Sequence, residues 1–216
     1  MKLSERTLQL LKSFSSINNS ILVRPGNIIR TMSSLKSVYV KAEVEETFEQ
    51  GFAIYDLSRF LGTVSLFSDP DFDFQEKFVT ISSGKQRVQY TYADESMIVY
   101  PPNKDVTFPP VEVEFVLTSE HLSTINKAGS VLQMPEIIIN CDGEVISIKT
   151  ADSDNPTSDT FSVDVGETDK DFRVVIKPEN LKLIPAKYDV ALTTNGIVRF
   201  ATENLIYWVA TEAKKS

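Results

Sequence analysis

The second half of this chain repeats sequence segments of the first half in the same order. Residues 3–8 have a counterpart in residues 117–122, an offset of 117 − 3 = 114 residues. Residues 52–56, which lead into a helical pattern, have a counterpart in residues 172–176, an offset of 172 − 52 = 120 residues. Solenoid repeats are shorter, about 20–50 residues, so the pattern predicts a pair of similar domains. Pseudo-symmetric subunits of this kind often close into rings.

The composition is that of a globular protein with an acidic surface. Of the 216 residues, 42% are hydrophobic and 24% are charged, and the formal net charge is -8. This charge argues against a nucleic-acid binder whose outer face is basic. The single cysteine, Cys141, excludes an intrachain disulfide and suits a reducing compartment. No apolar run approaches the ~20 residues that span a bilayer, so we expect a soluble, cytoplasmic protein without a membrane partner.

Hydrophobic periodicity predicts an α+β fold of two domains. Helices are expected at residues 4–18, 57–67, 118–132 and 178–183, with Ser4 and Asp56 as caps of the first two. The segments between the helices alternate like strands, among them residues 38–43, 47–55 and 97–99. Two helices in each half can cover only one face of an antiparallel sheet. Four of the ten prolines lie in residues 101–110, which therefore form a stiff, extended connecting loop. We expect an N-terminal domain at residues 1–100 and a C-terminal domain at residues 111–216.

The residues that would support catalysis are sparse. His121 is the only histidine, and on a helix it is more simply explained as a surface residue than as a general base. The chain shows no nucleophile elbow and no glycine-rich phosphate loop. Asp69, Asp71 and Asp73 alternate as in a calcium loop, but the glycine and the closing acid of that loop are missing. The sequence implies no cofactor and no metal site, and it favours a protein that is not an enzyme.

The expected helices carry a different balance of charge from the strands. Acidic residues gather on strands and loops, among them Glu43, Glu45, Glu46 and the aspartates of residues 69–73. The helices and their starts carry seven basic residues: Lys2, Arg6, Lys12, Arg59, Lys127, Lys177 and Lys182. Against these stand three acids, Glu5, Glu120 and Glu179, with Asp56 at a cap. If the helices share one face, that face is mildly positive and suits loose, sequence-independent contact with phosphates. Ordinary scatter of surface lysines is the alternative explanation.

The chain resembles the DNA sliding clamps of T-even-type bacteriophages. The motif that carries most of this likeness is Phe52-Ala53-Ile54-Tyr55-Asp56-Leu57. Further matching stretches are residues 1–4, 7–8, 10–12, 60–62, 65–66, 102–104, 108–109 and 207–212. The likeness is strong over the first 67 residues and thin over residues 69–97 and 152–169. The C-terminal end, residues 211–216, is shorter than the family pattern.

The resemblance implies a homotrimeric ring whose helices line a channel around duplex DNA. A clamp of this kind is opened by an ATP-dependent clamp loader and tethers the replicative DNA polymerase through a C-terminal peptide of that enzyme. In the family the clamp also couples replication to late transcription. The expected location is the cytoplasm of an infected bacterium.

The resemblance also assigns residues to three surfaces. The seven basic residues named above would face DNA. Walls of the polymerase-peptide pocket would be Tyr39, Phe108, Pro110 and Trp208, although Trp208 could equally belong to the core. The edges of adjacent subunits would meet through residues 87–92 and 158–165, with these side chains at the interface: Val88, Tyr90, Tyr92, Thr160, Ser162 and Asp164.

Two other classes of protein remain open from the sequence. A structural or virion-associated protein could use the duplicated sheets only to assemble. An enzyme acting through His121 is the weaker possibility. Oligomeric state and retention on end-blocked DNA would separate the clamp from the first, and replacement of His121 would test the second.

Overall fold

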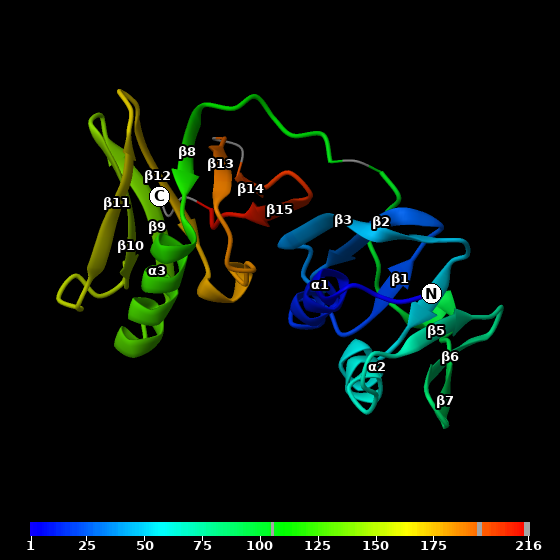
Figure 1. Cartoon of the computed structure of the whole chain (residues 1–216). Helices are drawn as coiled ribbons and strands as arrows, with labels where there is room; N and C mark the ends of the chain where they lie inside the picture. Colours follow the sequence, from blue (N-terminus) through cyan, green and yellow to red (C-terminus); the bar gives the residue numbers. More distant parts are fainter. Residues whose placement is uncertain (105, 194–195, 214–216) are drawn as a thin grey trace. The chain divides into compact units, whose positions relative to one another are not determined.

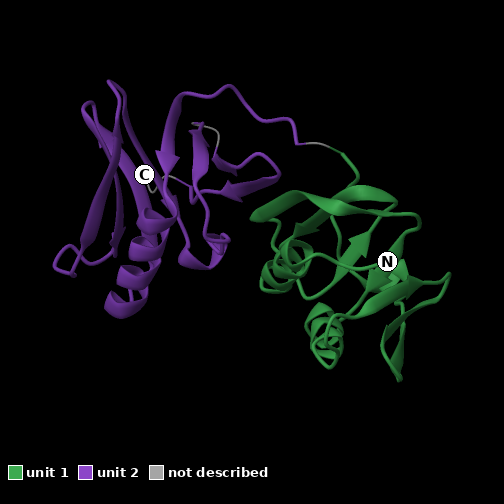
Figure 2. Ribbon diagram, viewed as in Figure 1, with its two compact units in different colours: residues 1–104 green, residues 105–216 purple. Residues whose placement is uncertain are grey.

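The computed structural model describes residues 1–104, 106–193 and 196–213. The chain forms two compact units, Met1–Lys104 and residues 105–216 (Figure 2). The division falls inside residues 101–110, the stretch that the sequence predicts as a connecting loop. We call the parts unit 1 and unit 2 and describe each separately.

Unit 1 combines α-helices with short strands and one 3-10 turn (Figure 1). Its elements in chain order are α1 (Glu5–Ser15), β1 (Ile21–Val23), β2 (Gly26–Met32), β3 (Val38–Phe48), β4 (Phe52–Ile54), α2 (Leu57–Val64), β5 (Asp71–Phe74), β6 (Phe78–Ser83), β7 (Gln86–Thr91) and η1 (Glu95–Met97). β1 pairs with β4, β2 with β3, and β5, β6 and β7 form a three-stranded sheet, all antiparallel. Helices α1 and α2 pack against each other, and α1 also contacts β3.

Strand β3 shows why one face of the sheet needs a helical cover. Its side chains alternate without a break from Val38 to Phe48, with every even-numbered residue buried. The sequence predicted two strands, at residues 38–43 and 47–55, and this division is wrong. The alternation continues through Glu46, so the strand continues with it, and the chain reverses only before Phe52.

Side-chain caps fix where the unit 1 helices begin. The Ser4 hydroxyl accepts a hydrogen bond from the Thr7 backbone N–H at 3.2 Å, and the Asp56 carboxylate accepts one from the Arg59 N–H at 2.8 Å. Both caps agree with the sequence prediction and satisfy amides that the helix itself leaves unpaired. The helices end earlier than predicted, at Ser15 and Val64.

Glu46 ties helix α1 to the sheet. Its carboxylate accepts a hydrogen bond from the Thr7 hydroxyl at 2.5 Å and another from the backbone N–H of Ser4. Burial alone would raise the pKa of Glu46, but these hydrogen bonds outweigh burial and lower it. The sequence prediction placed Glu46 with the surface acids, whereas the side chain is only 9% exposed. It is a structural anion at the positive end of a helix.

Unit 2 has one α-helix in its described residues (Figure 1). Its elements are β8 (Val113–Leu117), α3 (Ser119–Leu132), β9 (Glu136–Asp142), β10 (Val145–Ala151), β11 (Phe161–Glu167), β12 (Asp171–Ile176), η2 (Pro178–Asn180), β13 (Tyr188–Leu192), β14 (Ile197–Ala201) and β15 (Leu205–Ala210). One antiparallel sheet has the order β11-β10-β9-β12. In the other strand group β13 pairs with β8 and β14, and β14 pairs with β15.

Helix α3 covers the four-stranded sheet of unit 2. Leu122 and Ile125 of the helix are buried, as are Ile139 and Ile148 of the strands. Gly129 allows a close approach, since a Cβ atom there would lie 3.3 Å from the Thr150 methyl group. The Thr118 hydroxyl caps α3 by accepting from the His121 N–H at 3.1 Å. Thr118 thus caps α3 as Ser4 caps α1. The two residues correspond in the duplicated pattern, in which residues 3–8 match residues 117–122.

Two short predicted elements are different in the structure. The helix expected at residues 178–183 is only the 3-10 turn η2, because Leu181 and Leu183 are both buried and therefore follow a period of two. The segment between Pro178 and Pro185 is also too short to nucleate an α-helix. The strand expected at residues 97–99 is replaced by η1, which the Asp94 carboxylate caps through the Ser96 N–H at 2.9 Å.

Replacing Glu46 with glutamine should lower the free energy of unfolding at neutral pH by about 1.5–3 kcal/mol, because the charged acceptor of two hydrogen bonds is lost. Since the pKa of Glu46 is lowered by folding, its contribution is complete above the pKa of the unfolded chain. That contribution is lost as the pH falls through the folded-state pKa. The difference between wild type and Glu46→Gln should therefore shrink in acid, as measured by urea unfolding.

Glu45 gives a matched control for this experiment. It directly precedes Glu46 in β3, it has the same side chain, and it is exposed. Glu45→Gln should leave the free energy of unfolding within about 0.5 kcal/mol of wild type. Equal losses for both variants would contradict the anchoring role of Glu46.

Candidate functional site

Three of the predicted DNA-facing residues lie on the helices of unit 1. Arg6 and Lys12 are exposed on α1, and Arg59 is exposed on α2. None of the three forms an ion pair with another residue in the described part of the chain. Their charges are therefore available to an external anion.

Lys2 is placed differently from these residues. Its ammonium group forms an ion pair with the Asp69 carboxylate, and that hydrogen bond raises the pKa of Lys2. The negative charge of Asp71 adds to the effect. The sequence predicted Lys2 as a DNA contact, but a neighbouring acid already balances its charge.

A groove is lined by residues of α1, of α2 and of the segments that flank them. It has a volume of about 770 Å³ and is lined by apolar side chains such as Leu8, Leu61 and Phe67, with Lys12 at its margin. Leu66 lies nearby in sequence and is 72% exposed. The groove thus combines apolar side chains with two acids, Glu5 and Asp69, and one base, Lys12.

The predicted basic residues of unit 2 fall into two groups. Lys127 is exposed on α3 and forms no ion pair within the described residues. Lys177 stands before η2, where its ammonium nitrogen lies 3.7 Å from a carboxylate oxygen of Glu212. Lys182 is exposed after η2. Lys127, like Arg59, has no acidic partner in the part of the chain that the structure describes and could contact an external anion. Lys177, like Lys2, is already paired with an acid.

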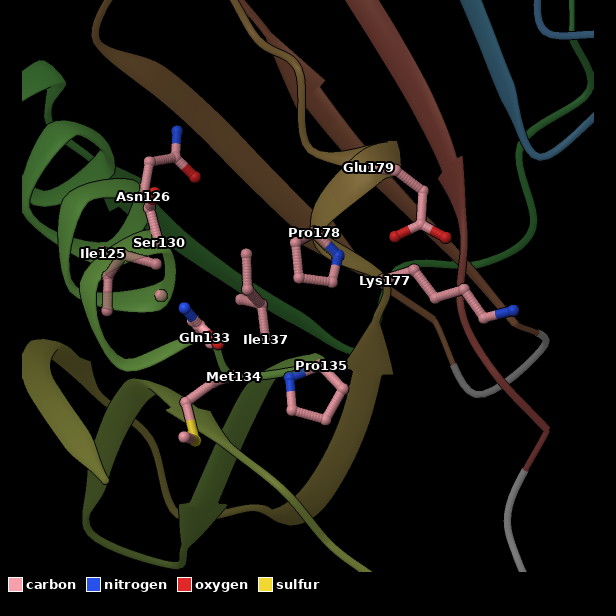
Figure 3. Close-up of a pocket in the computed structure, with 11 residues that line it drawn as sticks. Ile125, Asn126, Ser130, Gln133, Met134, Pro135, Ile137, Lys177, Pro178 and Glu179 are labelled. Atoms are coloured by element: carbon pink, nitrogen blue, oxygen red, sulfur yellow. The ribbon is translucent and has the colours of Figure 1, made fainter. Parts of the chain in front are cut away.

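A pocket of about 670 Å³ lies between the C-terminal half of α3 and η2 (Figure 3). Ile125, Met134 and Ile137 supply apolar walls, and Asn126 and Gln133 add amide groups. The pocket lies where η2 replaces the expected second helix. Figure 3 shows the Lys177 side chain extending away from α3. The sequence gave no signal for this pocket.

Two strands of unit 1, β3 and β5, carry acidic residues on their outward faces. Glu43 and Glu45 are exposed on β3, and Asp71 and Asp73 are exposed on β5. The run around Asp71 that suggested a calcium loop forms strand β5. In the described residues, no group of three or more His, Cys, Asp and Glu side chains is arranged to hold a metal ion.

The two segments predicted to join subunits form edge strands within their sheets. β7 pairs only with β6 among the described strands of its sheet, and β11 pairs only with β10. Each strand therefore has one row of main-chain groups without a strand partner in its own unit. Val88 lies in β7, and Ser162 and Asp164 lie exposed in β11, while the exposed Thr160 directly precedes that strand.

The two tyrosines of the predicted interface point toward the interior of unit 1. The Tyr90 ring lies 5.2 Å from the Phe60 ring of α2, and its hydroxyl donates to the Asp56 carbonyl oxygen at 3.2 Å. The Tyr92 ring stacks on Phe52 at 5.3 Å. Burial raises the pKa of Tyr92 to about 12. Both side chains thus anchor the end of the sheet to the core.

The predicted peptide-pocket residues have the following surroundings within their own units. The Tyr39 hydroxyl donates to the Lys104 carbonyl oxygen at 3.4 Å. The Phe108 ring lies 5.0 Å from the Arg199 guanidinium carbon, a cation–π geometry. Pro110 is exposed, whereas Trp208 on β15 is 9% exposed. The assignment of these four residues to one pocket stays a prediction.

Unit 2 contains a further hollow that the sequence did not indicate. It has a volume of about 410 Å³ and lies between the edge strand β12 and the ends of β8 and β13. Phe172, Val174 and Leu192 line it together with Thr211. The Glu212 N–H donates to the Val175 carbonyl oxygen at 2.8 Å, so the segment after β15 continues along β12.

Two protein-family models match the chain in sequence order. Residues 2–100 match the family "DNA polymerase processivity factor", and residues 114–213 match "gp45 sliding clamp, C terminal". The chain belongs to the phage sliding clamp family. A clamp of this family is a processivity factor for DNA polymerase and not an enzyme.

Individual relatives agree with this assignment over the whole clamp. The sliding clamp of Vibrio phage KVP40 is 34% identical over 221 residues, covering 99% of this chain and 100% of that protein. The sliding clamp of Escherichia phage RB69 is 31% identical and covers 99% of this chain and 97% of that protein. The sliding clamp of Enterobacteria phage T4 is 29% identical with the same coverage.

Solved structures show the same fold at low sequence identity. The Proliferating Cellular Nuclear Antigen of Entamoeba histolytica has a TM-score of 0.70 at 14% identity, covering 95% of the clamp and 94% of that chain. The A. fulgidus PCNA, solved with the C-terminal region of FEN-1 bound, has a TM-score of 0.73 at 14% identity. It covers 100% of the clamp and 98% of that chain. The predicted α+β clamp fold is therefore confirmed. Among its described residues the clamp has no helix long and apolar enough to cross a membrane.

Basic residues with and without an acidic partner should differ in how much their replacement changes DNA affinity. Arg59→Ala should reduce the slope of log affinity against log salt concentration by about 1 per subunit, because one phosphate contact is lost. Lys2→Ala should change that slope much less, because Asp69 already balances the charge. Fluorescence anisotropy of a labelled duplex over a range of salt concentrations measures both slopes. Equal losses for the two variants would contradict this ranking.

Proposed function

We propose that the clamp assembles as a homotrimeric ring that encircles duplex DNA and tethers the replicative DNA polymerase. Family membership supports the class of function. The observation that carries the arrangement is the contrast between helices and strands. Four basic residues, Arg6, Lys12, Arg59 and Lys127, are exposed on helices against two exposed acids, Glu5 and Glu120. The outward faces of β3 and β5 carry carboxylates. A channel lined by the helices would attract phosphates while the outer surface repelled them.

The proposed contact with DNA is weak and independent of sequence. Four available cations in each subunit give a salt-sensitive attraction to phosphates, which carries no information about bases. Retention would come from encirclement, so the ring could move along the duplex without leaving it. A tethered polymerase would then meet its template at a high effective concentration.

The proposed partners follow from this topology. A closed ring must be opened to admit DNA, and the sequence contains no nucleotide-binding motif of its own. We therefore propose an ATP-dependent clamp loader as a partner, acting in the cytoplasm of an infected bacterium. Coupling to late transcription is proposed on family membership alone.

The polymerase would bind through its C-terminal peptide. Tyr39, Phe108, Pro110 and Trp208 are the proposed walls of the pocket. The Phe108 ring is already held against Arg199, which would keep the connecting loop in place without a ligand. The related fold of A. fulgidus PCNA holds the C-terminal region of FEN-1, so a clamp fold can accept a C-terminal segment.

A DNA circle that is cut after loading tests encirclement directly. Clamp loaded onto a closed circle by its loader should remain bound through gel filtration, because the DNA offers no end. Linearisation should release the clamp, and a bulky block at both new ends should restore retention.

Equal loss from closed and cut DNA would overturn the proposal and favour a protein that only assembles. A clamp with Arg59→Ala provides the control, since encirclement should survive the loss of one phosphate contact per subunit. Its retention on closed circles should match that of wild type.

Trp208 gives an optical test of the peptide pocket. It is the only tryptophan of the chain, so its fluorescence reports on one position. Titration with the C-terminal peptide of the phage DNA polymerase should shift this emission, and Tyr39→Ala should weaken the titration about tenfold or more. An unchanged emission together with unaltered binding by Tyr39→Ala would remove these residues from the pocket.

A further inference from the structure

The two edge strands have matching faces. In β7, Val88 and Tyr90 lie opposite the fully buried Ile81 and Val79, on the side that Phe60 of α2 covers. In β11, Val163 and Phe161 lie opposite Ile148 and Thr150, on the side that faces α3. Each strand therefore has an apolar side toward its helix and a polar side toward solvent.

The polar sides of these strands carry opposite charges. Arg87 and Gln89 form the solvent side of β7, with Lys85 in the turn before it. Ser162 and Asp164 form the solvent side of β11, with Glu167 at its end. Residues 85–92 contain no acidic residue, and residues 159–167 contain no basic residue. Arg87 and Asp164 are both exposed and form no ion pair within the described chain.

Antiparallel pairing of the two strands has one register that satisfies both faces. It places Arg87 opposite Asp164, Val88 opposite Val163, Gln89 opposite Ser162 and Tyr90 opposite Phe161. Apolar side chains then meet on the helix side, while the cation and the carboxylate meet on the outer side.

Neighbouring registers lose these matches. A shift of one residue puts the polar side of one strand beside the apolar side of the other. A shift of two residues in one direction puts Gly166 opposite Arg87. A shift of two residues in the other direction puts Ser162 opposite Arg87 and Asp159 opposite Tyr90. Only the first register combines the charge pair with matched apolar residues.

We propose that β7 of one subunit pairs with β11 of a second copy in this register, and that the Arg87–Asp164 ion pair selects it. The inference rests on the ring of the proposed function and specifies how that ring closes. Because the pair lies on the outer side of the joined sheet, salt screens it. Ring affinity therefore falls as ionic strength rises, which makes this charge pair a control on ring opening.

Engineered disulfides test the register. Gln89→Cys combined with Ser162→Cys places two thiols on residues whose Cα atoms would be about 4.5–5.5 Å apart. Thr91→Cys with Ser162→Cys is the matched control, because it keeps Arg87 and Asp164 while a two-residue offset moves the Cα atoms to about 8 Å, beyond disulfide reach. The native Cys141 is buried and does not compete.

Oxidation should link the first variant into covalent dimers and trimers on a non-reducing gel. The control pair should stay largely monomeric under the same conditions. Preferential linking of the control pair, or no linking of either pair, would overturn the proposed register.

Charge reversal tests the ion pair independently. Arg87→Glu and Asp164→Arg should each weaken assembly about tenfold per interface, and the double reversal should restore it. Sedimentation equilibrium at low and high salt measures the association constants. Lys187→Glu and Glu203→Arg change the same charges at exposed positions away from both edges and should leave assembly unchanged.

The outcomes separate this inference from the proposed function. A wild-type trimer whose affinity is unaffected by either reversal would overturn the ion pair while leaving the ring intact. A wild-type protein that stays monomeric at high concentration would overturn the ring and the inference together. Restoration by the double reversal excludes misfolding as the cause of the single-variant losses.

Discussion

The structure depends on the need to bury one face of each sheet beneath a helix. Strand β3 shows the constraint plainly, since its even-numbered side chains from Val38 to Phe48 are all buried while the odd-numbered ones face outward. Helix α1 contacts the buried side of this strand, and α3 does the same for the four-stranded sheet of unit 2. This arrangement leaves the other face of each helix exposed, and those faces carry Arg6, Lys12, Arg59 and Lys127.

The same constraint decides where the chain can assemble. A helix covers the face of a sheet but not its sides, so β7 and β11 keep one unpaired edge each. An edge of this kind would promote aggregation unless a partner covers it. The anchoring of α1 by Glu46 and of the β7 sheet by Tyr90 keeps the helices and edges in defined positions. A rigid support of this sort is what a ring needs to close with the correct curvature.

Much of the fold could be predicted because its local signals agree with the final packing. The caps Ser4, Asp56 and Thr118 are short polar residues before apolar periodicity, and each marks a true helix start. The helix expected after Pro178 failed because Leu181 and Leu183 follow the period of a buried extended chain. The burial of Glu46 was missed, although the even-numbered alternation of β3 contained the signal for it.

The sequence predicted which basic residues lie on the helices, but not which of them form ion pairs with acids. The identity of the basic residues on helices could be read directly from the sequence. The partners of Lys2 and Lys177, which are Asp69 and Glu212, are distant in the chain and approach only through tertiary structure. The inward direction of Tyr90 was likewise hidden, because an aromatic residue in an edge strand suits either face.

The most direct test of DNA encirclement is an image of the clamp loaded on duplex DNA by electron cryomicroscopy. The expected image is a closed ring of three chains with the duplex through its centre and α1, α2 and α3 facing the phosphates. A duplex lying against the outer strand faces, or helices turned away from the DNA, would contradict it.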